Sequence, residues 1–97
     1  MGKPYRYTNA FEAVGFDPIE AEHLRIRADL MLELERLIAA RGLTQATAAK
    51  LLRVTQPRGS DLIRGKIDRF SIDTLVEMLS RAGADVSVKV RRRKDAA

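Results

Sequence analysis

Residues 44–66, TQATAAKLLRVTQPRGSDLIRGK, predict two short helices joined by a tight turn. Thr44 and Thr55 can each cap the helix that follows, because a threonine hydroxyl accepts a hydrogen bond from a free N–H group of a first helical turn. Only Arg53 and Val54 lie between the end of the first helix and the second cap. So short a link makes the two helices cross steeply, and the stretch therefore predicts a helix-turn-helix motif.

The two expected helices, residues 45–52 and 56–64, turn different kinds of residue inward and outward. The positions at the crossing are small or aliphatic: Ala48, Ala49, Leu52, Val54 and Leu62. The outward positions of the second helix are polar: Gln56, Ser60, Asp61 and Arg64, with Arg58 at the border. Many helical hairpins bind no DNA, but Gln and Arg side chains hydrogen-bond adenine and guanine edges. An outward face of this kind therefore favours contact with DNA.

The composition argues against an enzyme, a metal site or a membrane span. The 97 residues suffice for one domain, and they include no cysteine and a single histidine, His23. The acidic residues Glu33 and Glu35 are two positions apart on a helix, so their carboxylates point to different faces and do not converge. No apolar run approaches the roughly 20 residues that a membrane span requires. We expect a cytoplasmic protein with no cofactor and no enzymatic activity.

The charge is unevenly distributed along the chain. The net charge is +5 and the pI is about 10.1. Residues 9–40 hold seven acids against three bases, net −4, whereas residues 44–66 hold five bases against one acid, net +4. Residues 89–94 add five bases and no acid. The basic parts suit a polyanion such as double-stranded DNA, and the acidic part is expected to meet a different partner.

A long helix is expected before the motif, from Asp17 as its cap to a helix breaker at Gly42. Its length would be about 23 residues, or about 35 Å. One apolar stripe should pack on the helix-turn-helix: Leu30, Leu34, Leu37 and Ile38. A second stripe, near the helix start, should pack on the N-terminal arm, residues 1–16, or on another chain: Leu24, Ala28 and Met31.

A further helix is expected from its cap, Ser71, to near Ala82, and a strand should follow it. Three valines alternate with polar residues there, as in a half-buried strand: Val86, Val88 and Val90. A single strand needs a partner, which residues 5–7 or a second chain would supply. We therefore expect a homodimer that is stabilised by these three valines. The domain is expected to span residues 17–90, and residues 91–97 are expected to form a basic tail.

Three stretches of the sequence carry a resemblance to a known family: NAFEAVGF at 9–16, residues 41–66 with the helix-turn-helix, and DRFSIDTLVEMLSRAGADVSVKV at 68–90. Together the three stretches resemble the Xre/Cro-like helix-turn-helix regulators, and in particular the short HigA-type antitoxins. The resemblance implies a mostly α, lambda-repressor-like bundle with a C-terminal β-strand. It also implies a transcriptional regulator, foremost an antitoxin that represses its own operon and neutralises a protein toxin. Two alternatives stay open: a stand-alone or phage-derived regulator with no toxin partner, and a protein-interaction module whose helix-turn-helix is vestigial.

The resemblance also implies roles for individual residues of the motif. The side chains expected at base edges are Gln56, Arg58 and Ser60. The side chains expected on phosphates are Gln45, Thr55, Arg64 and Lys66. These roles agree with the chemistry, because helix N-termini and Lys or Arg hold phosphates while short polar side chains read base edges.

Two positions depart from the pattern of the family that the chain resembles. Arg53 stands where the turn commonly carries Gly, so a left-handed backbone there would be mildly strained. Gly59 stands where the family usually buries an aliphatic side chain, which predicts a gap in the packing and a less stable second helix. Gly59 is also the best support for a vestigial motif.

Overall fold

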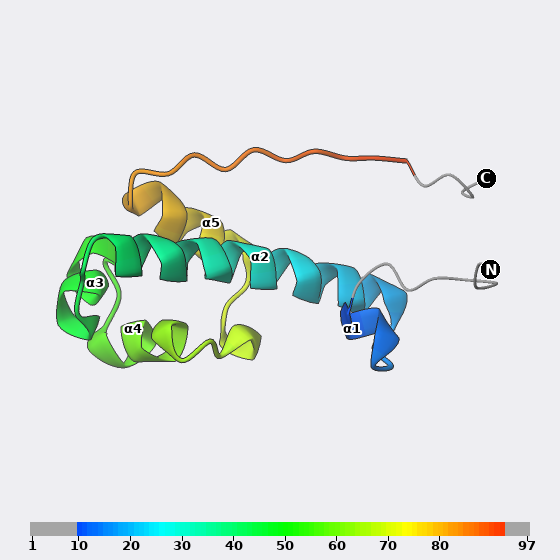
Figure 1. Cartoon of the computed structure of the whole chain (residues 1–97), viewed down its shortest axis with the longest axis horizontal. Helices are drawn as coiled ribbons and strands as arrows, with labels where there is room; N and C mark the ends of the chain where they lie inside the picture. The colour runs from blue at the N-terminus through cyan, green and yellow to red at the C-terminus, as the bar shows by residue number, and fades with distance from the viewer. Residues whose placement is uncertain (1–9, 93–97) are drawn as a thin grey trace.

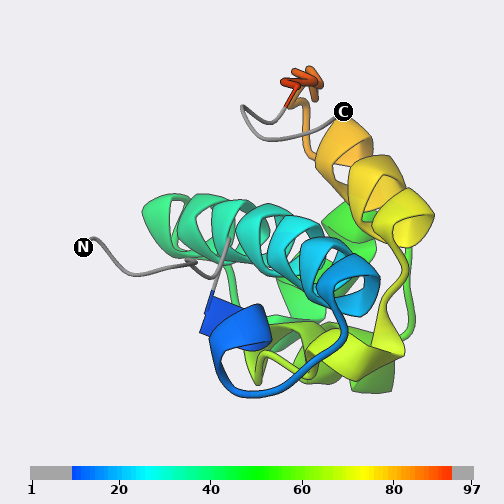
Figure 2. The same ribbon diagram turned by 90° about the vertical axis from the view of Figure 1, so that its right-hand side faces the viewer.

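The computed structural model describes residues 10–92. Within that range the chain forms five α-helices and one 3-10 turn (Figure 1): α1 Ala10–Ala13, α2 Pro18–Ala40, α3 Gln45–Leu52, α4 Gln56–Ile63, η1 Ile67–Arg69 and α5 Ile72–Arg81. Both views place α3 and α4 on one side of α2 and α5 on another (Figures 1 and 2). The mostly α fold that the sequence predicts is confirmed.

α2 runs along most of the molecule because its first turn is capped and no helix breaker interrupts it. The Asp17 carboxylate accepts hydrogen bonds from the N–H groups of Ile19 (3.0 Å) and Glu20 (3.3 Å), and Pro18 occupies the first helical position. A carboxylate and a proline both suit the start of a helix, where N–H groups lack partners within the helix. The helix has 23 residues, as the sequence predicts. None of the helices formed by the described residues combines the length and the apolar character that crossing a membrane requires.

The core lies where the second half of α2 meets α3, α4 and α5. Its largest fully buried side chains are Phe70, Leu34, Leu52, Leu62, Leu75 and Met78. Of the first predicted stripe of α2, Leu34 and Ile38 are buried in this core, whereas Leu30 and Leu37 are only partly buried against it. The prediction that the stripe packs on the helix-turn-helix is confirmed in part: Leu34 and Ile38 share the core with Leu52 and Leu62 of the motif, but α2 packs mainly against α5.

The first half of α2 is covered by the chain's own α1 and η1, so the first of the two expected partners, the N-terminal arm, is the one that packs on it. α1 and η1 both pack against α2, and the rings of Phe11 and Phe16 meet edge to face with centroids 6.1 Å apart. Leu24 and Met31 are only 8% and 4% exposed, and Ala28 is half-buried. Leu24 and Met31 are therefore buried within the single chain and are not available as dimer contacts.

Residues 84–92 follow α5 as an extended segment that runs back along the α5 side of α2 (Figure 1). Among the residues that the structure describes, none belongs to a strand, so the expected C-terminal β-strand is not confirmed. A strand is defined by its hydrogen-bonded ladder, and the described part of a single chain offers this segment no neighbouring strand. The expected partner at residues 5–7 lies outside the described residues. Val86 packs against the core, whereas Val88 and Val90 are 83% and 89% exposed.

Candidate nucleic-acid interface

α3 and α4 each begin at the threonine that the sequence assigns to the cap. The Thr44 hydroxyl accepts a hydrogen bond from the Thr47 N–H (3.1 Å), and the Thr44 N–H donates to the Thr47 hydroxyl (2.8 Å), so the two residues form a reciprocal capping box. The Thr55 hydroxyl accepts from the Arg58 N–H (3.3 Å). The predicted helix-turn-helix is confirmed, with Arg64 as the C-cap of α4 instead of its last helical residue.

The turn between the two helices is closed by Arg53 in a left-handed conformation, with φ 58° and ψ 46°. Among the described residues it is the one non-glycine residue with positive φ. Its N–H donates to the carbonyl of Lys50 (3.2 Å), and the Val54 N–H donates to the carbonyl of Ala49 (3.0 Å), so carbonyls at the end of α3 are satisfied. Arg53 thus adopts the left-handed backbone conformation for which the sequence predicts mild strain.

Arg53→Gly should raise the free energy of unfolding by about 0.5–1 kcal/mol, because glycine adopts a left-handed backbone without a Cβ clash. The Arg53 side chain is exposed and forms no ion pair with the described residues, so the change removes no such contact. Urea denaturation of both proteins measures the difference. Arg53→Ala is the control, because it keeps the Cβ and should not stabilise the fold. A glycine variant less stable than wild type would contradict the account of the turn.

α4 crosses α3 at Gly59, which is buried and lies inside α4. A Cβ built on Gly59 would lie 3.3 Å from the Ala49 Cβ and 3.5 Å from the Gln45 carbonyl oxygen. Contacts this short leave no empty space, so the predicted gap is wrong. The missing side chain instead allows the backbones of the two helices to approach closely, which is a recognised use of glycine. Gly59 therefore no longer supports a vestigial motif.

Several predicted DNA contacts lie on the surface of the motif. Gln45 and Gln56 are the first residues of α3 and α4, and both are exposed. Ser60, one turn further along α4, is half-buried, and Arg64 at the end of the helix is exposed. The Thr55 hydroxyl is already engaged in its cap. The structure thus presents two amide side chains at helix starts and a guanidinium at the end of α4.

Arg58, by contrast, is turned back onto the protein. Its Cζ lies 4.5 Å from the centroid of the Phe70 ring, and its Nη1 donates a hydrogen bond to the Arg69 carbonyl oxygen (2.9 Å). Phe70 is 1% exposed, so the guanidinium lies against a ring of the core. The sequence carries no signal for this contact, because the two side chains are twelve positions apart and an arginine on α4 equally suits a base edge.

Asp61, which the sequence places on the outward face of α4, is paired with bases that follow the helix. Its Oδ2 accepts a hydrogen bond from Arg69 Nη1 (3.1 Å), and its Oδ1 lies 4.0 Å from Lys66 Nζ. Lys66, an expected phosphate contact, is thus held near α4, together with Arg69, which the sequence reasoning missed. No group of acids and histidines that could hold a metal ion is found among the described residues.

Three bases of the helix-turn-helix have no acidic partner among the described residues. On α2 and α5, three bases are paired within their own helix, Arg25 with Glu22 and Asp29, Arg36 with Glu33, and Arg81 with Glu77, whereas Arg27 donates to the Ile67 carbonyl oxygen. In the described part of the chain, Lys50, Arg53 and Arg64 form no ion pair with an acid. Exposed positive charges of this kind attract a polyanion at long range, which suits the DNA backbone.

Comparisons with known proteins agree with this geometry. A family model described as a helix-turn-helix domain matches residues 13–91. The candidate antitoxin HigA2 of Mycobacterium tuberculosis (strain ATCC 25618 / H37Rv) is 28% identical over 92 residues, which make up 94% of this chain and 91% of that protein. A solved structure, described as a candidate transcriptional regulator of the XRE family, superposes with a TM-score of 0.72 at 29% identity, over 80% of this chain and 88% of that one. Since the family model spans most of the sequence, the chain belongs to the Xre-type helix-turn-helix family.

Proposed function

We propose that the chain is a sequence-specific DNA-binding transcriptional regulator that places α4 in the major groove. The observation that carries the proposal is a capped two-helix motif that has an exposed glutamine at each helix start and carries three bases without an acidic partner, Lys50, Arg53 and Arg64. N-terminal N–H groups bind phosphates, and glutamine amides hydrogen-bond adenine edges. The proposed base-reading side chains are Gln56 and Ser60. The proposed phosphate contacts are Gln45, Thr55, Arg64 and Lys66.

Gln56→Ala should weaken binding to the specific site by about 1–3 kcal/mol and leave binding to random DNA nearly unchanged, because it removes a base contact. Arg64→Ala should weaken binding to the specific duplex and to the random duplex by a similar factor. It should also reduce the slope of the logarithm of the binding constant against the logarithm of the salt concentration by about 1, as the loss of a phosphate contact does. Fluorescence anisotropy with both duplexes at several salt concentrations measures these effects. Equal losses on both duplexes for Gln56→Ala would refute the division of roles.

A second exposed surface supports the antitoxin role over that of a stand-alone regulator. The junction of α1 and α2 leaves Val14, Phe16 and Ile19 exposed, at 74%, 41% and 72%. Asp17 and Glu20 lie beside them in sequence and are exposed as well. An apolar patch with acidic neighbours suits a basic protein partner, and the similarity to the candidate antitoxin HigA2 points to a toxin as that partner. The junction lies at the end of α2 away from α3 (Figure 1), so the DNA-facing motif would stay free.

Co-expression with the product of a neighbouring gene, followed by affinity capture, tests the antitoxin role. A stable complex with a small basic protein whose toxicity the chain suppresses would support it. Operator binding by a chain that captures and neutralises no such partner would favour the stand-alone regulator.

We further propose a homodimer in which residues 86–90 of two chains pair as antiparallel strands. Residues 85–92 form no backbone hydrogen bond with other described residues, so their donors and acceptors are free to pair. With a two-fold axis at Val88, Val90 of one chain would lie opposite Val86 of the other. The six valines of the two strands would then share one face.

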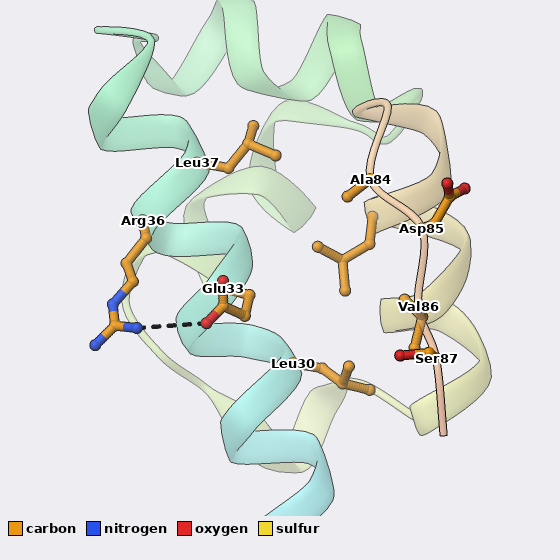
Figure 3. A pocket seen from close by; sticks show the side chains of 9 residues that line it. Leu30, Glu33, Arg36, Leu37, Ala84, Asp85, Val86 and Ser87 are labelled. Carbon is orange, nitrogen blue, oxygen red and sulfur yellow. Dashed lines mark hydrogen bonds and ion pairs between the residues drawn. The ribbon is translucent and has the colours of Figure 1, made fainter. Parts of the chain in front are cut away.

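A groove under this segment favours the same arrangement. Its volume is about 530 Å³, and Leu30 and Leu37 of α2, Leu79 of α5 and Val86 provide its apolar lining. Figure 3 shows Leu30 and Leu37 extending from α2 toward the segment that carries Ala84 and Val86. The valines of a paired second strand would cover this apolar lining. A dimer would also bring two α4 helices into a fixed relation, as the reading of two half-sites requires.

A further inference from the structure

We propose that Arg58 is a positioning residue that clamps residues 66–70 against α4, and that it acts on DNA through this segment without reading a base. The inference rests on the DNA-binding function proposed above. It replaces the base-edge role that the sequence suggested for Arg58.

The Arg58 guanidinium has two contacts, one with an aromatic ring and one with a backbone carbonyl. The group lies 4.5 Å from the centroid of the Phe70 ring, within the range in which a cation is attracted to an aromatic face, and it donates to the Arg69 carbonyl oxygen at 2.9 Å. An Arg58 side chain extended away from the protein toward a base edge would lose both contacts. That movement would uncover a ring that is now 1% exposed. Base contact therefore competes with the packing of the core.

A second tie joins the same two segments. Asp61 lies three residues after Arg58 on α4, hence on the same side of the helix. It accepts a hydrogen bond from the Arg69 guanidinium (3.1 Å) and has Lys66 Nζ at 4.0 Å. Arg69 is therefore held twice, by its carbonyl oxygen and by its side chain. This pairing also neutralises the one acid of α4, which would otherwise repel phosphates.

The two ties fix the position of Lys66 and Arg69 relative to α4. Both bases lie in the segment that follows the helix, where they would meet the DNA backbone beside the groove that α4 enters. If Arg58 releases the segment, these bases keep only their tie to Asp61 and are held less firmly. Every DNA sequence is then affected alike, because phosphates carry no sequence information. Discrimination between sequences stays with the exposed Gln56.

The test compares the full-length wild type with Arg58→Ala, Arg58→Lys and Phe70→Leu on the preferred duplex and on a random duplex. Arg58→Ala should weaken binding to both by the same factor, and Arg58→Lys should restore much of the loss because it keeps a cation over the ring. If Arg58 read a base, Arg58→Ala would instead lower the ratio of the two affinities by about 5- to 150-fold, and lysine would not rescue it, because lysine lacks the bidentate geometry. That result would overturn the proposal.

Two readouts in the free protein separate this proposal from the function on which it rests. The Arg58 Nε–H resonance should be shifted upfield by the Phe70 ring, and Phe70→Leu should abolish that shift. Amide exchange in residues 66–70 should accelerate in Arg58→Ala but not in Arg64→Ala, an arginine of the same region without an acidic partner. If the shifted resonance and the accelerated exchange are both observed in a protein that binds no DNA, the contact of Arg58 with residues 66–70 is supported and the proposed regulator function is refuted. An unshifted resonance with unchanged exchange would refute the clamp.

Discussion

Val88→Asp is expected to convert the dimer into a monomer and to lower the affinity for an operator of two half-sites by at least about 100-fold. Val88 is 83% exposed in the single chain and would lie at the centre of the paired strands, so aspartate would bring two carboxylates together in an apolar layer. A monomer also lacks the increase in affinity that comes from binding two linked half-sites, which is on the order of 10²- to 10⁴-fold. Sedimentation velocity measures the mass, and anisotropy measures the affinity.

The matched control places the same carboxylate one residue further along. Side chains of adjacent strand residues point to opposite faces, so Lys89→Asp should leave the dimer intact. A Val88→Asp protein that remains dimeric at micromolar concentration would contradict the strand pairing. A monomeric variant that binds the operator as tightly as wild type would contradict the reading of two half-sites.

Gly59→Val is the second change for which a large effect is expected, namely a loss of about 1–3 kcal/mol in the free energy of unfolding, as for other overpacked cores. A Cβ alone would lie 3.3 Å from the Ala49 Cβ and 3.5 Å from a backbone oxygen of α3, and valine adds two further methyl groups. The backbone oxygen cannot move without shifting α3. Each kcal/mol should lower the Tm by roughly 4–8 °C in a domain of this size. Calorimetry or thermal circular dichroism measures the change.

Moving a methyl group across the crossing provides the control. Gly59→Ala combined with Ala49→Gly keeps one methyl group between the helices and should be closer to wild type than Gly59→Val. If Gly59→Val were as stable as wild type, α3 and α4 would not be in close contact at this position.

The helix starts were predictable because each depends on residues a few positions apart. Asp17, Thr44, Thr55 and Ser71 each accept a hydrogen bond from a first-turn N–H, and the helix in each case begins at the next residue. The exposure of Gln56 at the start of α4 follows from the same local reasoning. The motif and much of its outward face could therefore be derived from the sequence.

The contacts between distant residues could not be derived in this way. The chemistry of Arg58 fits a base edge and an aromatic ring equally well, and only the folded chain brings Phe70 beside it. At Gly59 the sequence shows that a side chain is missing. Whether this leaves a gap depends on the distance between α3 and α4, which the sequence does not give. The alternation at residues 86–90 predicts a half-buried strand, which is not confirmed: Val88 and Val90 are exposed, and a ladder requires a partner strand that the described single chain does not provide.

The central claim, sequence-specific DNA binding through α4, is tested most directly by anisotropy with the DNA upstream of the chain's own gene and a random duplex of equal length. Wild type is expected to prefer the upstream duplex by at least about 10³-fold at physiological salt. Gln56→Ala should lose much of this preference while its affinity for the random duplex stays nearly the same. Equal affinity of wild type for the two duplexes, or binding to neither, would contradict the account.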